Sequence, residues 1–213
     1  MIAVLTGDIV GSSYQDKTKW LPALKSALQY FGQEGEDWEI YRGDEFQLRL
    51  PSPDNALLAA FLIKARLIAR AETHIRIAIG LGLADPPNDH PAPYSTPLTQ
   101  SGGPAFILSG RKLDEIKSRR IHLAMASDND DFDKSWNLLL QWVLITADSW
   151  SSGSAEIVDL CLVAPELSQM EMASQLNIAQ SAISQRLKRS GFDLLAQTLA
   201  LFKEKINALW KHS

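Results

Sequence analysis

Hydrophobic residues along the first 150 positions follow two spacings, one typical of strands and one typical of helices. Short apolar runs and strict apolar–polar alternation predict strands, because successive side chains of a strand point to opposite faces. Apolar residues three or four positions apart predict helices that bury one face. These patterns predict strands within residues 2–5, 38–50, 74–83 and 121–126, and helices within residues 16–31, 55–71, 103–117 and 132–149.

Residues 38–50 are expected to form a hairpin rather than one strand. Gly43-Asp44 lies at its centre, and residues of this kind adopt the backbone angles of a tight turn. Phe46 and Leu48 alternate with polar residues, which predicts one buried and one solvent-exposed face of the strand. The order strand, helix, hairpin, helix, strand, helix, strand then predicts an α+β sandwich of the ferredoxin-like kind.

The strand predicted over residues 74–83 has large residues on one face and small residues on the other. Isoleucines and leucines fill the first face, and Ala78, Gly80 and Gly82 lie on the second. Small side chains on a strand allow close approach of a ligand or of a neighbouring helix. The sequence leaves both alternatives open.

The helix predicted over residues 55–71 is rich in alanine and leucine, with one apolar stripe. It also carries three basic side chains, Lys64, Arg66 and Arg70. Charged residues of an amphipathic helix usually lie opposite its apolar stripe. These three are therefore predicted to form a solvated face.

A small polar break at residues 150–154 separates the α+β domain, residues 1–150, from a second predicted domain, residues 151–213. The second domain is expected to be all-α, with a helix-turn-helix over residues 167–191. Ser168 and Glu171 have the spacing of a capping box at the start of its first helix. The buried side of the helix pair is predicted to consist of Ala173, Leu176, Ile178, Ile183 and Leu187.

The second helix of this motif has the composition of a DNA recognition helix. Polar side chains near the start of such a helix reach base edges, and basic side chains contact phosphates and position the protein. The residues predicted to point outward are Gln180, Ser181, Ser184, Gln185 and Lys188, and those suited to phosphates are Arg186, Lys188 and Arg189. A helical pair used only for packing or for protein contact is the alternative.

The last predicted helix, residues 192–212, is longer than the small domain needs. Its apolar stripe consists of Leu195, Leu199, Phe202, Ile206 and Leu209. The stripe could fold back onto the domain or pair with the same helix of a second copy. Because helix-turn-helix proteins usually bind two half-sites, a homodimer is expected.

Composition limits the class of protein and the way in which it could bind DNA. Of 213 residues, 46% are apolar and 22% are charged, which is ordinary for a protein with a core, and the net charge is −4. Without overall positive charge, DNA can be attracted only by a local basic patch. The single cysteine, Cys161, excludes a disulfide within the chain and favours a reducing cytoplasm. Neither a signal peptide nor the roughly 20-residue apolar run of a membrane span is expected.

Two aspartates are candidates for a metal site. Asp8 follows the first strand and precedes a turn with Gly11 and Ser12, and Asp44 lies in the hairpin turn. If the two strands are neighbours, both carboxylates lie at one end of the sheet and repel each other unless a cation lies between them. Mg²⁺ held by one or two carboxylates and by phosphates is a common arrangement. The alternative is that the acid only caps a turn.

Several motifs resemble those of class III nucleotide cyclases. Residues 8–12, Asp-Ile-Val-Gly-Ser, are similar to the first metal motif of that family, and residues 42–46, Arg-Gly-Asp-Glu-Phe, are similar to its hairpin or to the diguanylate-cyclase signature. Residues 74–82 are similar to the cyclase strand that ends in a glycine, and residues 103–111 to the cyclase helix that carries an asparagine and an arginine. With a helix-turn-helix at its end, the chain as a whole most resembles the SatD family.

The resemblance implies a cyclase-like domain that binds Mg²⁺ or Mn²⁺ together with a nucleotide effector. The metal ligands that it implies are Asp8 and Asp44, and the nucleotide-binding residues are Gly11, Ser12 and Arg111.

Two positions depart from the cyclase pattern. Ile107 stands where the family has its transition-state asparagine, and Ile40 stands where it has the base-selecting lysine. An isoleucine side chain cannot donate a hydrogen bond. The first hypothesis is therefore a cytoplasmic DNA-binding transcriptional regulator whose degenerate cyclase-like domain is a sensor. The alternatives are a nucleotide-processing enzyme with an accessory helix-turn-helix, and a first domain that serves only for dimerisation.

Overall fold

The computed structural model describes residues 1–41, 43–84, 97–98 and 101–210, and within them the fold is α+β with a five-stranded mixed sheet. The strand order is β2-β3-β1-β4-β5, and every neighbouring pair is antiparallel except β4 and β5, which run parallel. The strands are β1 (Ile2–Ile9), β2 (Trp38–Tyr41), β3 (Glu45–Leu50), β4 (Ile75–Gly82) and β5 (Leu123–Ala126). The predicted α+β class is confirmed.

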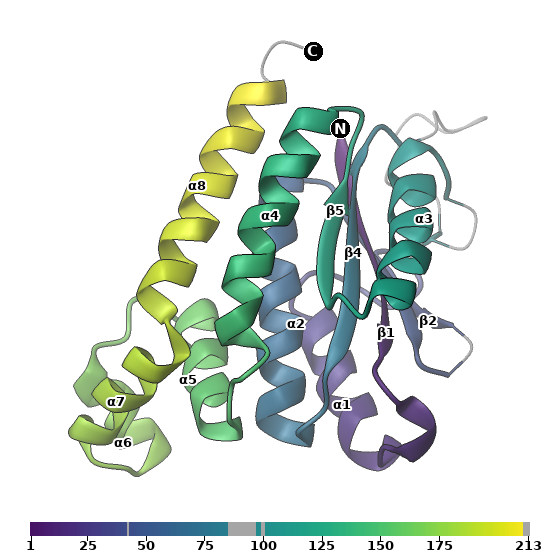
Figure 1. The fold of residues 1–213 in the computed structure, drawn as a ribbon. Coiled ribbons are helices and arrows are strands. Elements are labelled where there is room, and N and C mark those ends of the chain that lie inside the picture. Colours follow the sequence, from purple (N-terminus) through teal and green to yellow (C-terminus); the bar gives the residue numbers. More distant parts are fainter. Residues whose placement is uncertain (42, 85–96, 99–100, 211–213) are drawn as a thin grey trace.

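In the described ranges, helix α3 covers one face of the sheet, and α1, α2 and α4 lie on the other face (Figure 1). None of the helices in these ranges combines the length and the apolar character that crossing a bilayer requires. The helices are α1 (Lys17–Leu28), α2 (Ala56–Ala71), α3 (Pro104–Arg119), α4 (Asp130–Ala147), α5 (Ser152–Val163), α6 (Gln169–Leu176), α7 (Gln180–Ser190) and α8 (Phe192–Trp210), with 3₁₀ turns at Ser12–Tyr14 and Pro53–Asn55. Each predicted strand and helix has a counterpart among these elements.

The main core lies between the sheet and the helices on its α2 side. Alternate residues of β4, such as Ile75, Ile77 and Ile79, point into it and are almost fully buried. Strand β1 has paired strands on both edges, and all but one of its residues are buried. This position explains why its sequence is a continuous apolar run and does not alternate.

Helix α2 is buried on nearly every side, because it contacts α1, α5, β1 and β4. Twelve of its 16 residues are buried, and they include Lys64 and Arg66. The prediction that these two side chains lie on a solvated face is therefore wrong. The side chain of Arg70 is 54% exposed, as predicted.

Arg66 forms a buried, two-pronged ion pair with Asp159 of α5. Its Nε and Nη2 donate to the Asp159 carboxylate at 2.7–3.1 Å, and its Nη1 donates to the carbonyl of Ser26 in α1 at 2.8 Å. A guanidinium is suited to this place because its planar fork matches a carboxylate. One arginine therefore joins α1, α2 and α5.

The core continues from the sheet into the C-terminal helices. Val158 of α5 and Phe202 of α8 belong to the same buried cluster as the strand residues. Trp150, between α4 and α5, donates from Nε1 to the carbonyl of Ser190 at 2.9 Å. The predicted division at residue 150 stays a prediction, and in the structure side chains pack continuously across it.

The small residues on β4 face helix α3. A Cβ atom at Gly80 would lie 2.1 Å from the carbonyl oxygen of Ala105, and one at Gly82 would lie 3.0 Å from the Ala105 nitrogen. Of the two alternatives left open by the sequence, a neighbouring helix is the one found. Glycine is required there because α3 approaches the strand backbone too closely for a side chain.

We predict that Asp159→Asn lowers the free energy of unfolding by about 3 kcal/mol, because it leaves the Arg66 charge buried and unpaired. Urea unfolding followed by circular dichroism measures this. Glu115→Gln is the matched control, since Glu115 and its partner Arg119 are 43% and 60% exposed and such surface pairs contribute less than about 1 kcal/mol. A loss for Asp159→Asn no larger than for the control would contradict the assigned role of the pair.

Candidate functional site

Polar side chains gather along the border of the sheet formed by strand ends, where β1 ends and where β3, β4 and β5 begin. The register places Asp8 opposite Glu45 on one side and Arg76 on the other. The amide of Ile77 donates to the carbonyl of His122, so the start of β5 lies beside the start of β4. We call this region the polar sheet edge; its side chains are Asp8, Glu45, His74, Arg76 and His122.

Asp8 lies between two cations of the protein. Its carboxylate accepts from Nη1 of Arg76 at 3.1 and 3.3 Å, and Nζ of Lys117 in α3 lies 3.6 Å away. Lys117 also donates to Glu45 at 2.9 Å. Burial alone would lower the pKa of Lys117, but the carboxylates of Glu45 and Asp8 outweigh burial and raise it. The structure therefore balances the Asp8 charge with an arginine and a lysine.

The turn that follows β1 and the hairpin turn before β3 are held together. The hydroxyl of Ser12 donates to the Asp44 carboxylate, and the amide of Ile9 donates to the Asp44 carbonyl at 3.3 Å. Gly11 adopts the left-handed backbone conformation with φ of 68°, which starts this turn. The contact links Ser12 to Asp44, whereas Asp8 pairs with Arg76 and Lys117.

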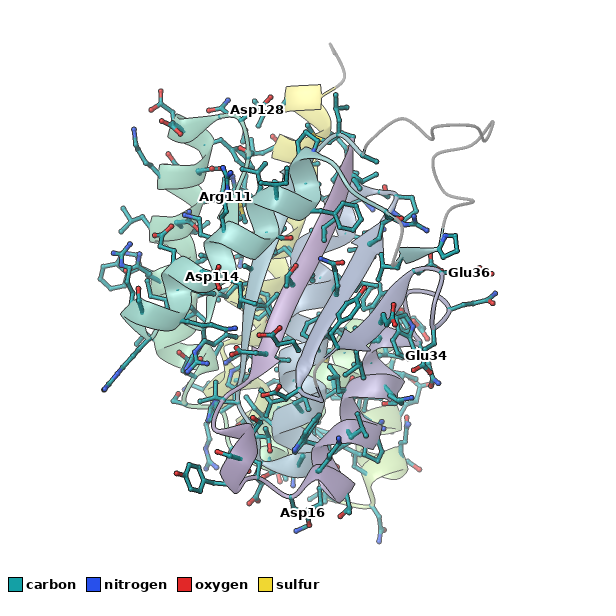
Figure 2. All side chains as sticks on the ribbon, turned by 90° about the vertical axis from the view of Figure 1, so that its right-hand side faces the viewer. Asp16, Glu34, Glu36, Arg111, Asp114 and Asp128 are labelled. Atoms are coloured by element: carbon teal, nitrogen blue, oxygen red, sulfur yellow. The ribbon has the colours of Figure 1, made fainter. Side chains whose placement is uncertain are left out.

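Arg111 lies on the outer surface of α3. The buried residues of this helix are Ala105, Ser109, Leu113 and Ile116, and Arg111 lies on the opposite side, exposed to solvent. Figure 2 looks onto this side of the molecule and labels Arg111 and Asp114 on α3. It is Lys117, two turns nearer the helix end, that reaches Asp8.

A second polar group lies where the two parallel strands begin. His74 directly precedes β4, His122 directly precedes β5, and Asp148 follows α4. The two imidazoles stack with their ring centres 5.8 Å apart. One ligand atom from each of the three residues lies within 4.8 Å of the others. Among the His, Cys, Asp and Glu residues that the structure describes, this group has metal-ligand spacing, so it is a candidate metal-binding triad. Asp8 and Asp44, the predicted metal ligands, do not belong to it.

Lys64 of α2 also reaches this triad. Its Nζ donates to Oδ1 of Asp148 at 2.5 Å, and Nδ1 of His122 lies 3.0 Å from the same oxygen. Burial alone would raise the pKa of Asp148, but His122 and Lys64 outweigh it and hold the pKa below its ordinary value. Burial, together with the nearby Lys64 charge, lowers the pKa of His74 and favours the neutral imidazole.

Sequence reasoning did not assign a role to Arg76, Lys117 or the triad. Their partners are distant in the chain; Asp148 and Lys64, for example, are separated by 84 positions. One signal was present in the sequence, because a histidine occupies the first or second position of each of two predicted strands, residues 74–83 and 121–126. Neighbouring parallel strands bring residues near their starts together, but the strand order had to be known first.

Helices α6 and α7 are joined by a short turn at residues 177–179, with Asn177 in the left-handed conformation. The capping box of Ser168 and Glu171 is present, as predicted. Buried side chains from three helices form one cluster beneath the pair: Ile157 and Cys161 of α5, Met172 and Ala173 of α6, and Ile183 of α7. Helices α5, α6 and α7 therefore form one packed unit, which lies at one end of the molecule in Figure 1.

Most of the residues predicted to contact DNA are exposed on α7. The exposed ones are Gln180, Ser181, Ser184, Gln185, Lys188 and Arg189. Arg186 is used differently: its Nη1 donates to Glu156 of α5 at 2.6 Å, and its guanidinium packs against Gly153. Arg186 therefore orients α7 on α5.

We predict that the Cys161 thiol is unreactive in the folded chain. It is buried beside Met172, with 3.9 Å between the sulfur atoms, and burial raises its pKa from 9.0 to about 11. Because the thiolate is the reacting species, alkylation at pH 8 should be at least about 100-fold slower than in urea, and should accelerate as the pH rises toward 11. Mass spectrometry after iodoacetamide treatment measures both rates, and similar rates in the two states would contradict the burial of Cys161.

Comparison of the chain with protein-family models, with curated proteins and with solved structures gives no match. The resemblance to the SatD family therefore stays a prediction from sequence motifs. Any assignment of function depends on the residues of the polar sheet edge and of α7.

Proposed function

We propose that the chain is a DNA-binding regulator that reads duplex DNA with α7. One observation carries the proposal. Helix α7 buries Ile183 against α5 and α6, and its remaining surface presents six exposed polar or basic side chains. Packing accounts for the buried side of α7 and gives these six side chains no role, whereas DNA recognition would use them.

The order of side chains along α7 supports this reading. Gln180, Ser181, Ser184 and Gln185 occupy its first half, where the side chains of a recognition helix reach base edges. Glutamine forms two hydrogen bonds with adenine through the oxygen and the nitrogen of its side-chain amide. Lys188 and Arg189 at the other end are suited to phosphates. The ion pair of Arg186 with Glu156 would hold α7 at a fixed angle on α5.

The local charge of α7 also supports DNA binding in a chain whose net charge is −4. The helix sequence, QSAISQRLKRS, contains three basic residues and no acidic residue. The overall field of the protein does not attract DNA, so the affinity has to come from contacts made by this helix. Binding should therefore be sensitive to single substitutions on α7.

For the first part of the chain, we propose a cyclase-like module without catalytic activity. The order β2-β3-β1-β4, all antiparallel, supports a ferredoxin-like core. Ile107 and Arg111, at the positions aligned with the cyclase asparagine and arginine, are both exposed on α3. Mg²⁺ or Mn²⁺ at Asp8 would have to compete with Arg76 and Lys117 for the carboxylate. These pairings of Asp8 count against metal-dependent phosphoryl chemistry at this position.

We further propose that the regulator is a homodimer joined through α4 and α8. Large apolar side chains are exposed along both helices: Leu138, Trp142 and Ile145 on α4, and Leu194, Leu201 and Leu209 on α8. They recur at helical spacing on the surface that faces away from the core. Because α8 begins directly after Gly191 at the end of α7, a two-fold axis through this surface would fix the spacing of two α7 helices. Two half-sites on DNA require a fixed spacing of this kind.

We predict that Lys188→Ala and Arg189→Ala each weaken binding to all duplex sequences and reduce the slope of log K against log salt by about 0.9. Gln180→Ala and Gln185→Ala should instead change the preference among sequences, because they would remove base contacts. Fluorescence anisotropy of the full chain on a selected duplex, at several salt concentrations, measures these effects.

Lys19→Ala is the matched control for these substitutions. Lys19 lies on α1, is exposed, and carries the same charge as Lys188. It should leave both affinity and slope unchanged. Equal losses for Lys19→Ala and Lys188→Ala would show that binding follows net charge and would contradict recognition by α7.

We predict that Trp142→Glu shifts the chain from dimer to monomer, because it places a charge in the apolar surface of α4. Light scattering coupled to gel filtration measures the mass. Tyr14→Glu is the control, since Tyr14 is 95% exposed and belongs to the 3₁₀ turn at Ser12–Tyr14 and not to α4 or α8. A dimer that is unchanged by Trp142→Glu, or a parent chain that is monomeric at micromolar concentration, would contradict the proposed interface.

A further inference from the structure

We propose that His74, His122 and Asp148 form a binding site for a first-row transition-metal ion, with Zn²⁺ as the best match. This inference does not depend on DNA binding. It rests on three features of the group: its spacing, its unpartnered ring nitrogens and its donor types.

The spacing of the three side chains is that of a nearly closed ligand set. Zn²⁺ binds imidazole nitrogen and carboxylate oxygen at about 2.0–2.2 Å, so two ligands of one tetrahedral ion lie a little over 3 Å apart. Nδ1 of His122 and Oδ1 of Asp148 are already 3.0 Å apart. All three ligand atoms lie within 4.8 Å, so small rotations of the side chains would close the set.

The ring nitrogens add independent evidence. Nδ1 of His74 and Nδ1 of His122 are both buried, and neither has a hydrogen-bond partner. Although Nδ1 of His122 is close to Asp148, it lacks the direction of a hydrogen bond to it. Buried polar atoms without a partner are uncommon and require an explanation. A metal ion at the triad would accept the lone pair of the unpartnered Nδ1 of His122, which lies beside Asp148.

The donor types select the class of ion. Two imidazoles and one carboxylate suit Zn²⁺ and its first-row neighbours, whereas Mg²⁺ and Ca²⁺ prefer oxygen ligands. Three protein ligands leave a position for water or for a further ligand. The predicted Mg²⁺ or Mn²⁺ at Asp8 and Asp44 would be a different site with a different preference.

Lys64 opposes the ion in two ways. Its Nζ donates to Oδ1 of Asp148 at 2.5 Å and so occupies a carboxylate oxygen that the ion would use. Its positive charge repels a metal ion a few ångströms away. Replacing Lys64 by the uncharged Met should therefore strengthen metal binding, whereas removing a ligand should weaken it.

The test is calorimetric titration of the full chain, freed of metal with a chelator, with ZnCl₂, repeated with Co²⁺ while its visible absorption is recorded. We expect binding of one ion per chain and the absorption of a Co²⁺ ion in a low-coordinate nitrogen and oxygen site. His74→Gln, His122→Gln and Asp148→Asn should each weaken binding by more than about 10-fold. Lys64→Met should bind Zn²⁺ several-fold more tightly. Titration with MgCl₂ should give the same heat for the parent and for His74→Gln, because Mg²⁺ should not bind at this site.

The matched control uses the two other histidines of the chain, His90 and His212, which lie outside the described residues. The double variant His90→Gln/His212→Gln should bind Zn²⁺ as the parent does. Circular dichroism tests whether each variant is folded. If a ligand variant fails to fold, Lys64→Met still tests the site, because it keeps all three ligands. The site would be disproved by an absence of saturable binding in the parent, by unchanged binding in folded His122→Gln, or by weaker binding in folded Lys64→Met.

Discussion

Two cations that helix α2 carries into the interior constrain the arrangement of the surrounding helices. A buried charge is tolerated only when it is paired and hydrogen-bonded. Arg66 therefore requires Asp159 of α5 and the Ser26 carbonyl of α1, and Lys64 requires Asp148 at the end of α4. The apolar residues of α2 could pack in several ways, but these pairs fix which part of each neighbour faces it. Together the two ion pairs hold the end of α4 and helix α5 against α2.

This constraint connects the sheet to the proposed DNA-binding unit. Asp159 and Glu156 lie on the same helix, and Glu156 holds Arg186 of α7. Asp148 belongs to the triad at the polar sheet edge and is followed two positions later by Trp150, which bonds to the end of α7. An ion or effector bound at this edge would thus act on residues that are one or two contacts from α7. The route is short and consists of the Arg66–Asp159 and Arg186–Glu156 ion pairs, the Trp150–Ser190 hydrogen bond and the chain segment between Asp148 and Trp150.

How far the sequence predicts the structure depends on the distance between interacting residues. The capping box of Ser168 and Glu171 and the buried Ala173 and Ile183 were predicted, because their signals lie within a few positions of each other. The solvated face assigned to Lys64 and Arg66 was wrong, since their partners are 84 and 93 positions away. For the same reason, predicting the pairing of Asp8 with Arg76 would have required knowledge of the register of β1 and β4. Helix propensity and spacing carry no information about such contacts.

The most direct test of the central claim, that α7 is the surface that meets DNA, is nuclear magnetic resonance of the ¹⁵N-labelled chain titrated with a duplex. Backbone amides report contact residue by residue and do not depend on substitutions. The account predicts that shifts concentrate in Gln180–Ser190 and the preceding turn, and that they diminish when salt is added. Shifts centred on the polar sheet edge or on α3, with α7 unaffected, would contradict it.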